Sequence, residues 1–296
     1  MFSLELACDA ADGLGESPIW HPEEQALYWL DHHEPSMKRL DPATGKVDKW
    51  ILPEYVGSIG LRKDGTFVAG AWSGFGFLDF HRRKLEIVVD PEPDIEGNRL
   101  NDGKVDPAGR FWCGSMNINF VDYRATASLY RFDPDGRCHR MDTGFIVTNG
   151  IAFSPDRRSM HYSDSSGKIV YRYDYDAASG TVSNRRTFMA SINIPGHSGK
   201  IDGATFDSEG FYWGAIVYDG FIGRFDPQGR LVRQIRMPVT NPTMPVFGGR
   251  DYDTLYVTSA RKFVNAMQST QNPLEGGLFA LRGLGVRGQP EPRFAG

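Results

Sequence analysis

Polar side chains crowd one short stretch of the chain, "GNRLNDGKVDPAGRFWCGS" at residues 97–115. In its second half, the turn formers Pro107 and Gly109 are followed by Phe111 and Trp112, a pattern that favours a strand, a tight turn and another strand. The first half does not fit that pattern, because it gathers amides and charges: Asn98, Arg99, Asn101, Asp102 and Lys104. A solvated loop rarely needs so many directional hydrogen-bonding groups together, so this stretch is a candidate site.

Asn101 has counterparts elsewhere in the chain. It lies five positions before the first residue of its turn, and the same offset from five similar turns gives a mostly polar set: Glu16, Gly57, Asn101, Asn149, Asp202 and Thr243. We call Glu16, Asn101, Asn149 and Asp202 the oxygen ring. If buried together, these groups need water or a cation. Oxygen ligands suit Ca²⁺, Mg²⁺ or Mn²⁺, with Zn²⁺ or Fe²⁺ held through the carboxylates; a wet channel holding structural waters is the alternative.

The elements that must position the oxygen ring form an internal repeat. Units with an apolar residue, a polar turn and an aromatic-rich strand begin at residues 18, 58, 103, 150, 203 and 245. Most units carry a second hairpin, such as "RLDPATGKV" from residue 39. Six units of about four strands each predict an all-β fold, a six-bladed β-propeller, with innermost strands that begin near a central channel. A β-sandwich pair or a barrel does not predict a two-hairpin unit repeated six times.

The ends of the chain are expected to close the propeller. The early stretch "SLELACD" should pair with the late strand "GLFALR" of the last blade, so that no sheet edge stays open. No shift in composition marks a linker, and we therefore expect one propeller domain over residues 1–296.

Composition narrows the possible partners. The 296 residues are 40% hydrophobic and carry a net charge of −4, which argues against nucleic acid or an anionic membrane as the main partner. The N-terminus lacks the pattern of a signal peptide, and no segment has the roughly 18 apolar residues of a membrane span, so we expect a cytoplasmic protein. The sequence leaves the oligomeric state open, and a monomer is compatible with it.

Other candidate groups carry less weight. His32 and His33 have no third metal ligand at a suitable spacing, which favours a solvated loop. Lys200 lies close to Asp202 in the sequence, and its expected place is a surface loop. The chain has no G-x-S-x-G nucleophile elbow and no glycine-rich phosphate loop ahead of a helix.

The motifs "GLGESPIWHPEEQALYWLD", "NRLNDGKVDPAGRFWCGSM", "TNGIAFSPD" and "DGATFDSEG", with the late "PVTNPTMPVFGG", together resemble the gluconolactonase/regucalcin family, also called senescence marker protein. The resemblance covers essentially the whole chain. It implies a six-bladed propeller that holds one divalent cation in its central channel and hydrolyses a small-molecule sugar lactone.

The resemblance also assigns roles to residues. The family's metal ligands correspond to Glu16, Asn149 and Asp202, and its substrate contacts correspond to Arg99 and Asn101. Two positions depart from the family pattern. Ser17 replaces the usual glycine after the metal-ligating glutamate, a small change that should leave the ligand in place. Asn119 stands where the animal regucalcins have an acidic substrate contact, which leaves the preference among sugars open.

Two classes of function follow from this assignment. In the first, the protein is a metal-dependent lactonase: the cation polarises the lactone carbonyl, Asp202 is the general base, and Arg99, Asn101 and Asn119 contact the substrate. In the second, the same residues form a non-catalytic, regucalcin-like calcium site. A variant of the first is a lactonase that acts on a non-sugar ester, since fold does not fix function.

Overall fold

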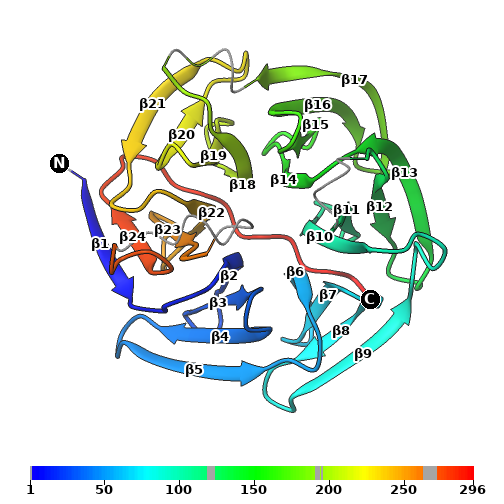
Figure 1. Ribbon diagram of the computed structural model, residues 1–296, viewed down its shortest axis with the longest axis horizontal. Coiled ribbons are helices and arrows are strands. Elements are labelled where there is room, and N and C mark those ends of the chain that lie inside the picture. Colours follow the sequence, from blue (N-terminus) through cyan, green and yellow to red (C-terminus); the bar gives the residue numbers. More distant parts are fainter. Residues whose placement is uncertain (1, 119–123, 191–193, 195, 263–271) are drawn as a thin grey trace.

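The computed structural model describes residues 2–118, 124–190, 194, 196–262 and 272–296. Six four-stranded antiparallel sheets lie around a central channel, which confirms the predicted six-bladed β-propeller (Figure 1). Blade by blade, the strands are β2 (Gly15–His21), β3 (Ala26–Asp31), β4 (Ser36–Asp41) and β5 (Lys46–Ile51); β6 (Val56–Leu61), β7 (Phe67–Ala71), β8 (Gly74–Asp79) and β9 (Lys84–Val89); β10 (Asn98–Val105), β11 (Phe111–Asn117), β12 (Ala127–Phe132) and β13 (Cys138–Phe145); β14 (Thr148–Phe153), β15 (Ser159–Asp164), β16 (Ile169–Asp176) and β17 (Thr181–Ala190); β18 (Lys200–Phe206), β19 (Tyr212–Val217), β20 (Phe221–Phe225) and β21 (Leu231–Arg236); and β22 (Pro242–Gly248), β23 (Thr254–Ser259) and β24 (Leu278–Arg282) with β1 (Ser3–Cys8). In the described part of the chain, no helix is long and apolar enough to cross a membrane.

An aspartate holds the turn that follows the innermost strand in two of the blades. Asp106 Oδ1 accepts hydrogen bonds from two backbone N–H groups of its turn, and Oδ2 accepts the indole N–H of Trp112 at 2.9 Å. Asp207 bonds its own turn and the indole N–H of Trp213 in the same way, also at 2.9 Å. Both indoles are fully buried. The turn is thereby fixed to the blade core, and with it the position of residues five places earlier in the strand.

The two termini tie the blades together. Strand β1 pairs antiparallel with β24, from Ser3 opposite Arg282 to Cys8 opposite Leu278, as the sequence predicts. The C-terminal segment, residues 283–296, then runs across the middle of the propeller (Figure 1). Near its end, the N–H of Phe294 donates to the Leu61 carbonyl at 2.7 Å.

Candidate active site

Each innermost strand breaks its pairing register near its start. The breaks lie between Glu16 and Ile19, Val56 and Ser58, Leu100 and Gly103, Asn149 and Ala152, Ile201 and Ala204, and Pro242 and Pro245. Such bulges re-aim side chains that a regular strand would place on alternate faces of the sheet. All four residues of the oxygen ring lie within or at the edge of a bulge, so this local irregularity brings them to the same end of the channel.

A cavity of about 140 Å³ occupies that end of the channel. Its lining includes Gly57 and Arg99 together with the whole oxygen ring. Thr243, at the sixth equivalent position, is not in this lining; its hydroxyl donates to the Gly15 carbonyl at 2.5 Å. The cavity is smaller than the ~300–1,000 Å³ of sites for drug-sized ligands. It therefore suits a small polar molecule rather than a polymer.

Three carboxylates, Glu16, Asp102 and Asp202, line the cavity. Burial raises the pKa of Glu16 well above its usual range, and the nearby charges of Asp202 and Asp102 raise it further. Burial, reinforced by the charge of Asp102, raises the pKa of Asp202 to about 8. Burial also raises the pKa of Asp102 to about 6, although a hydrogen bond from the N–H of Ile151 opposes the shift. The ionised forms are therefore disfavoured by crowding and desolvation, and a positive charge at this place would relieve both.

The two amides of the oxygen ring are bonded to each other. Asn101 Nδ2 donates to Asn149 Oδ1 and to the Thr148 carbonyl, both at 2.8 Å. Asn149 Nδ2 donates to Ser165 Oγ at 2.9 Å. These bonds fix the orientation of the Asn149 amide. Because an amide oxygen has two lone pairs, Asn149 Oδ1 retains one acceptor position.

The guanidinium of Arg99 lies over the ring of Tyr55. Its guanidinium carbon is 4.0 Å from the centre of the Tyr55 ring, and its Nη1 donates to Asn101 Oδ1 at 2.8 Å. Among the described residues, Arg99 forms no ion pair, and its side chain donates hydrogen bonds through Nη1 alone, to the Leu100 carbonyl and Asn101 Oδ1. Its other N–H groups remain available to a ligand, since a guanidinium has five donors.

His32 lies in a turn after β3, as the predicted loop requires, but the prediction that its side chain is solvated is wrong. His32 lines the cavity, where one ring nitrogen lies 3.1 Å from the Gly57 carbonyl and the other 3.1 Å from the hydroxyl of Tyr55. Burial holds the pKa of His32 well below its usual range. The neutral imidazole therefore supports Tyr55, which in turn supports Arg99. Only His33, the second residue of the pair, is exposed.

The donor set fits a divalent cation. Glu16 and Asp202 supply two carboxylates and Asn149 one amide oxygen, which is the ligand chemistry of a hard cation with room for further oxygens. Among the described residues, no three His, Cys, Asp or Glu side chains gather at metal-binding spacing.

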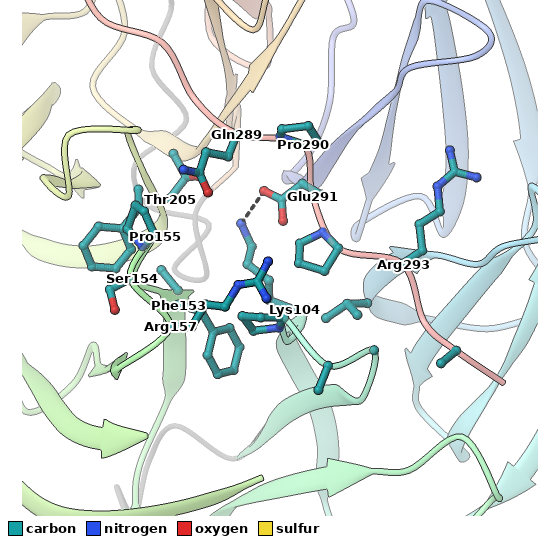
Figure 2. Close-up of a pocket in the computed structure, with 18 of the residues that line it drawn as sticks. Lys104, Phe153, Ser154, Pro155, Arg157, Thr205, Gln289, Pro290, Glu291 and Arg293 are labelled. Atoms are coloured by element: carbon teal, nitrogen blue, oxygen red, sulfur yellow. Dashed lines mark hydrogen bonds and ion pairs between the residues drawn. The ribbon is translucent and has the colours of Figure 1, made fainter. Parts of the chain in front are cut away.

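A second cavity lies at the other end of the channel, further along the innermost strands. Further along β10, β14 and β18, Lys104, Phe153 and Thr205 line a cavity of about 470 Å³, which the C-terminal segment borders with Glu291. Lys104 Nζ lies 3.0 Å from Glu291 Oε1 across it (Figure 2). No residue of the oxygen ring takes part in this second cavity. The candidate chemistry therefore belongs to one end of the channel.

The structure places most, but not all, of the predicted site residues. It brings Glu16, Arg99, Asn101, Asn149 and Asp202 to one cavity, whereas Asn119 lies outside the described residues. Lys200 is not in a surface loop: it begins β18 and lines the same cavity. Sequence reasoning missed four members of the site: Tyr55, Asp102 as a cavity carboxylate, His32 and Ser165. Only Asp102 lay within a stretch that the sequence marked as polar.

The backbone conformation of Ser17 explains why glycine is usual at this position in the family that the sequence resembles. Its φ of 48° lies in the left-handed region that favours glycine. The Ser17 hydroxyl accepts a hydrogen bond from the N–H of Ile59 at 3.0 Å, and its own N–H lies 3.3 Å from Glu16 Oε2. The serine thus keeps the turn that orients Glu16.

Comparison with known proteins identifies the family of this chain. Residues 14–261 match the family model described as "SMP-30/Gluconolactonase/LRE-like region". The chain is 41% identical to the 6-deoxy-6-sulfogluconolactonase of Pseudomonas putida, over 96% of this chain and 95% of that one. It is 34% identical to the regucalcin of Gallus gallus, over the full length of both. The solved structure of a calcium-binding protein, regucalcin, from Agrobacterium tumefaciens superposes with a TM-score of 0.90 at 28% identity, covering 99% of this chain and 97% of the other. The chain therefore belongs to the SMP-30/gluconolactonase/LRE-like family.

Proposed function

We propose that this protein is a divalent-cation-dependent lactonase that opens a sugar lactone to the sugar acid. The observation that carries the proposal is the convergence of two carboxylates, an oriented amide and a guanidinium with free donors on one small cavity. A relative named as a sulfogluconolactonase at 41% identity supports lactone hydrolysis as the reaction class.

Glu16, Asn149 and Asp202 would hold the cation. When bound, it supplies Lewis-acid polarisation of the carbonyl and favours ionisation of water. Its positive charge would also lower the pKa of Asp202, which burial and Asp102 raise to about 8 in its absence. In this proposal, Asp202 is then a carboxylate that accepts a proton from the attacking water. The water oxygen bonds to the carbonyl carbon, the ring C–O bond breaks, and the proton passes to the departing ring oxygen.

Arg99 and Asn101 have different tasks in this proposal. Arg99 presents its remaining N–H groups to the hydroxyls of the sugar and so positions the lactone. Both Asn101 N–H groups and its oxygen already have partners in the protein. Asn101 therefore positions Arg99 and Asn149, instead of donating directly to the substrate.

The test is acid release from a panel of aldonolactones, followed with a pH indicator. We expect turnover well above spontaneous hydrolysis, its loss on addition of a chelator, and its recovery when one of Ca²⁺, Mg²⁺, Mn²⁺, Zn²⁺ or Fe²⁺ is restored. Asp202→Ala should remove nearly all turnover even with metal supplied, because it deletes a ligand and the base together.

Asp207→Asn is not a suitable control, because Asp207 holds the blade core. Asp251→Ala is suitable, since Asp251 is an exposed carboxylate in a turn outside both cavities. Full activity of Asp202→Ala with metal present would contradict the mechanism. Cation binding by the wild-type protein with no turnover on any lactone or simple ester would instead support the non-catalytic calcium site.

A further inference from the structure

Lys200 is a cation in the wall of the candidate active site, and its ammonium has no hydrogen-bond or ion-pair partner among the described residues. It is the first residue of β18, is half-buried, and lines the cavity with Glu16 and Asp202. No described residue forms a hydrogen bond or an ion pair with its ammonium. Surface lysines usually extend their charge into water, so a lysine placed in a cavity wall without a carboxylate partner requires an explanation.

The charges around the cavity leave Lys200 in excess. Glu16, Asp102 and Asp202 carry three negative charges when ionised. Arg99 and a divalent cation together carry three positive charges and balance them. Lys104, deeper in β10, is already paired with Glu291 (Figure 2). With the proposed cation in place, the three cavity carboxylates are therefore balanced without Lys200, and among the carboxylates that act on Lys200 only Asp164 lies outside this balance.

Lys200 has charged groups of both signs nearby. Burial lowers its pKa and the charge of the neighbouring Lys168 lowers it further, whereas the charges of Asp202 and Asp164 raise it. Lys168 donates to the Ser198 carbonyl at 2.7 Å and does not line the cavity. Of these two lysines, Lys200 is therefore the one whose side chain a ligand in the cavity would meet.

We propose that Lys200 binds an anionic group on the substrate, a phosphate, sulfonate or carboxylate at the end of the sugar remote from the lactone carbonyl. This inference rests on the proposed lactonase function and specifies its substrate class. Lysine is a compact, strongly hydrated point charge that accommodates a tetrahedral or planar oxyanion without a fixed bidentate geometry.

The spacing along β18 agrees with this role. Two residues of a strand rise about 6.6 Å, so the backbone of Lys200 is set back from that of Asp202 by about the size of one sugar ring. With Asp202 at the reacting carbonyl, that separation would let Lys200 contact the opposite end of a six-carbon lactone. The flexible side chain of lysine can cover the remaining distance.

The experiment compares lactones that differ only in this group. The probes are glucono-δ-lactone, its 6-phosphate and 6-sulfonate analogues, and a glucaric acid lactone with a carboxylate at C6. In the wild type, we expect a higher kcat/KM for at least one anionic lactone than for the neutral one, falling with added NaCl as charges are screened. Lys200→Met should reduce the ratio of anionic to neutral kcat/KM by about 10- to 100-fold, mainly through KM.

Two further variants sharpen the result. Lys200→Arg should recover much of the anionic preference, because it keeps the charge. Lys168→Met is the matched control, and it should change the ratio by less than about threefold, since Lys168 lies outside the cavity and its ammonium is bonded to the Ser198 carbonyl. Whichever of the three anionic lactones shows the largest Lys200-dependent ratio identifies the group.

The possible failures can be told apart. Equal losses on neutral and anionic lactones in Lys200→Met would overturn the inference and leave the lactonase intact. Absence of turnover on every lactone would count against the lactonase itself. In that case, binding of 6-phosphogluconate and gluconate, measured by calorimetry, still decides the point: a preference for the phosphate that disappears in Lys200→Met supports the inference, and equal affinities contradict it.

Discussion

Asn101 joins two parts of the site through a single side chain. Its amide hydrogens hold Asn149 Oδ1 and the Thr148 carbonyl, and its oxygen holds the guanidinium of Arg99. A group on the cation side and a group on the sugar side thus depend on the same side chain. Polar residues that orient ligands in this way usually influence affinity and rate almost as much as the ligands themselves.

We therefore expect Asn101→Ala to reduce kcat/KM by about 10- to 100-fold and to weaken cation binding as well. Steady-state kinetics on a lactone that the wild type opens, with a metal titration, measures both effects. Asn98→Ala is a control in the same strand, because Asn98 bonds Glu92 and the Thr126 carbonyl and does not line the cavity. An increase in KM with unchanged metal affinity would mean that Asn101 acts only on the substrate side.

His161 makes stability depend on pH at a place far from this chemistry. It is 2% exposed, neither ring nitrogen has a hydrogen-bond partner among the described residues, and its ring lies 4.4 Å from that of Phe188. Burial lowers its pKa to about 3, from 6.5 in the unfolded chain. Above pH 6.5 the imidazole is mainly neutral in both the folded and the unfolded state, so it adds little pH dependence to the stability there. Below that pH the unfolded state takes up a proton that the folded state refuses, and stability falls by up to about 1.4 kcal/mol per pH unit toward pH 3.

Urea unfolding at pH 7, 6 and 5 tests this dependence. Between pH 7 and 5, the wild type should lose about 2 kcal/mol more unfolding free energy than His161→Leu. His81→Leu should behave like the wild type, since the His81 side chain is 65% exposed. Parallel pH profiles for wild type and His161→Leu would contradict the assignment.

The residues that the sequence could predict share one property: they recur at a fixed distance from a repeated turn. Glu16, Asn149 and Asp202 were accessible in this way, because a repeat converts sequence offset into a shared position in space. Tyr55 and His32 have no such offset and reach the cavity from the segments around β3 and β6. Lys200 has no offset either, and its burial depends on how the neighbouring blades pack.

At the scale of the strand, the bulge is what makes the ligands converge. The break in β14 between Asn149 and Ala152 contains Gly150, whose φ is +61°. A Cβ on Gly150 would lie 2.6 Å from the Tyr212 hydroxyl and 3.0 Å from the Asp202 carbonyl oxygen. Glycine thus permits both the backbone conformation and the close approach of β18, and with them the placement of Asn149 near Asp202.

Gly150→Ala should therefore lower both activity and cation affinity, together with about 1–3 kcal/mol of stability from strain. Gly210→Ala is the matched control, because Gly210 has a φ of +86° in a surface turn with no atom near its added Cβ. Gly150→Ala and Gly210→Ala both force an alanine into a left-handed backbone conformation. Only Gly150→Ala should also displace Asn149. If kcat/KM and metal affinity respond equally in the two, the close approach at β14 does not position the site.

At the scale of the whole molecule, the two ends of the channel differ in kind. One end carries the cavity of the oxygen ring, and the C-terminal segment borders the cavity at the other. The sequence predicted that β1 and β24 would close the ring of blades, since both have a clear strand pattern. The course of residues 283–296 was not predictable, because that segment lacks a repeat and is fixed by scattered contacts with several blades.

The C-terminal segment should stabilise the propeller without taking part in the reaction. Phe294 is fully buried, and its ring stacks on that of Phe132 with centres 5.6 Å apart. Phe294→Ala should cost about 3–5 kcal/mol of unfolding free energy, the range for removing a buried phenylalanine, with kcat/KM within about threefold of the wild type well below the melting temperature. Urea unfolding and lactone kinetics on the same preparation measure both, with Phe2→Ala, at a ring 38% exposed, as the control of small effect. If Phe294→Ala is as stable as the wild type, the C-terminal segment does not stabilise the propeller through this residue. If the variant is folded but has lost turnover, the two ends of the channel are coupled.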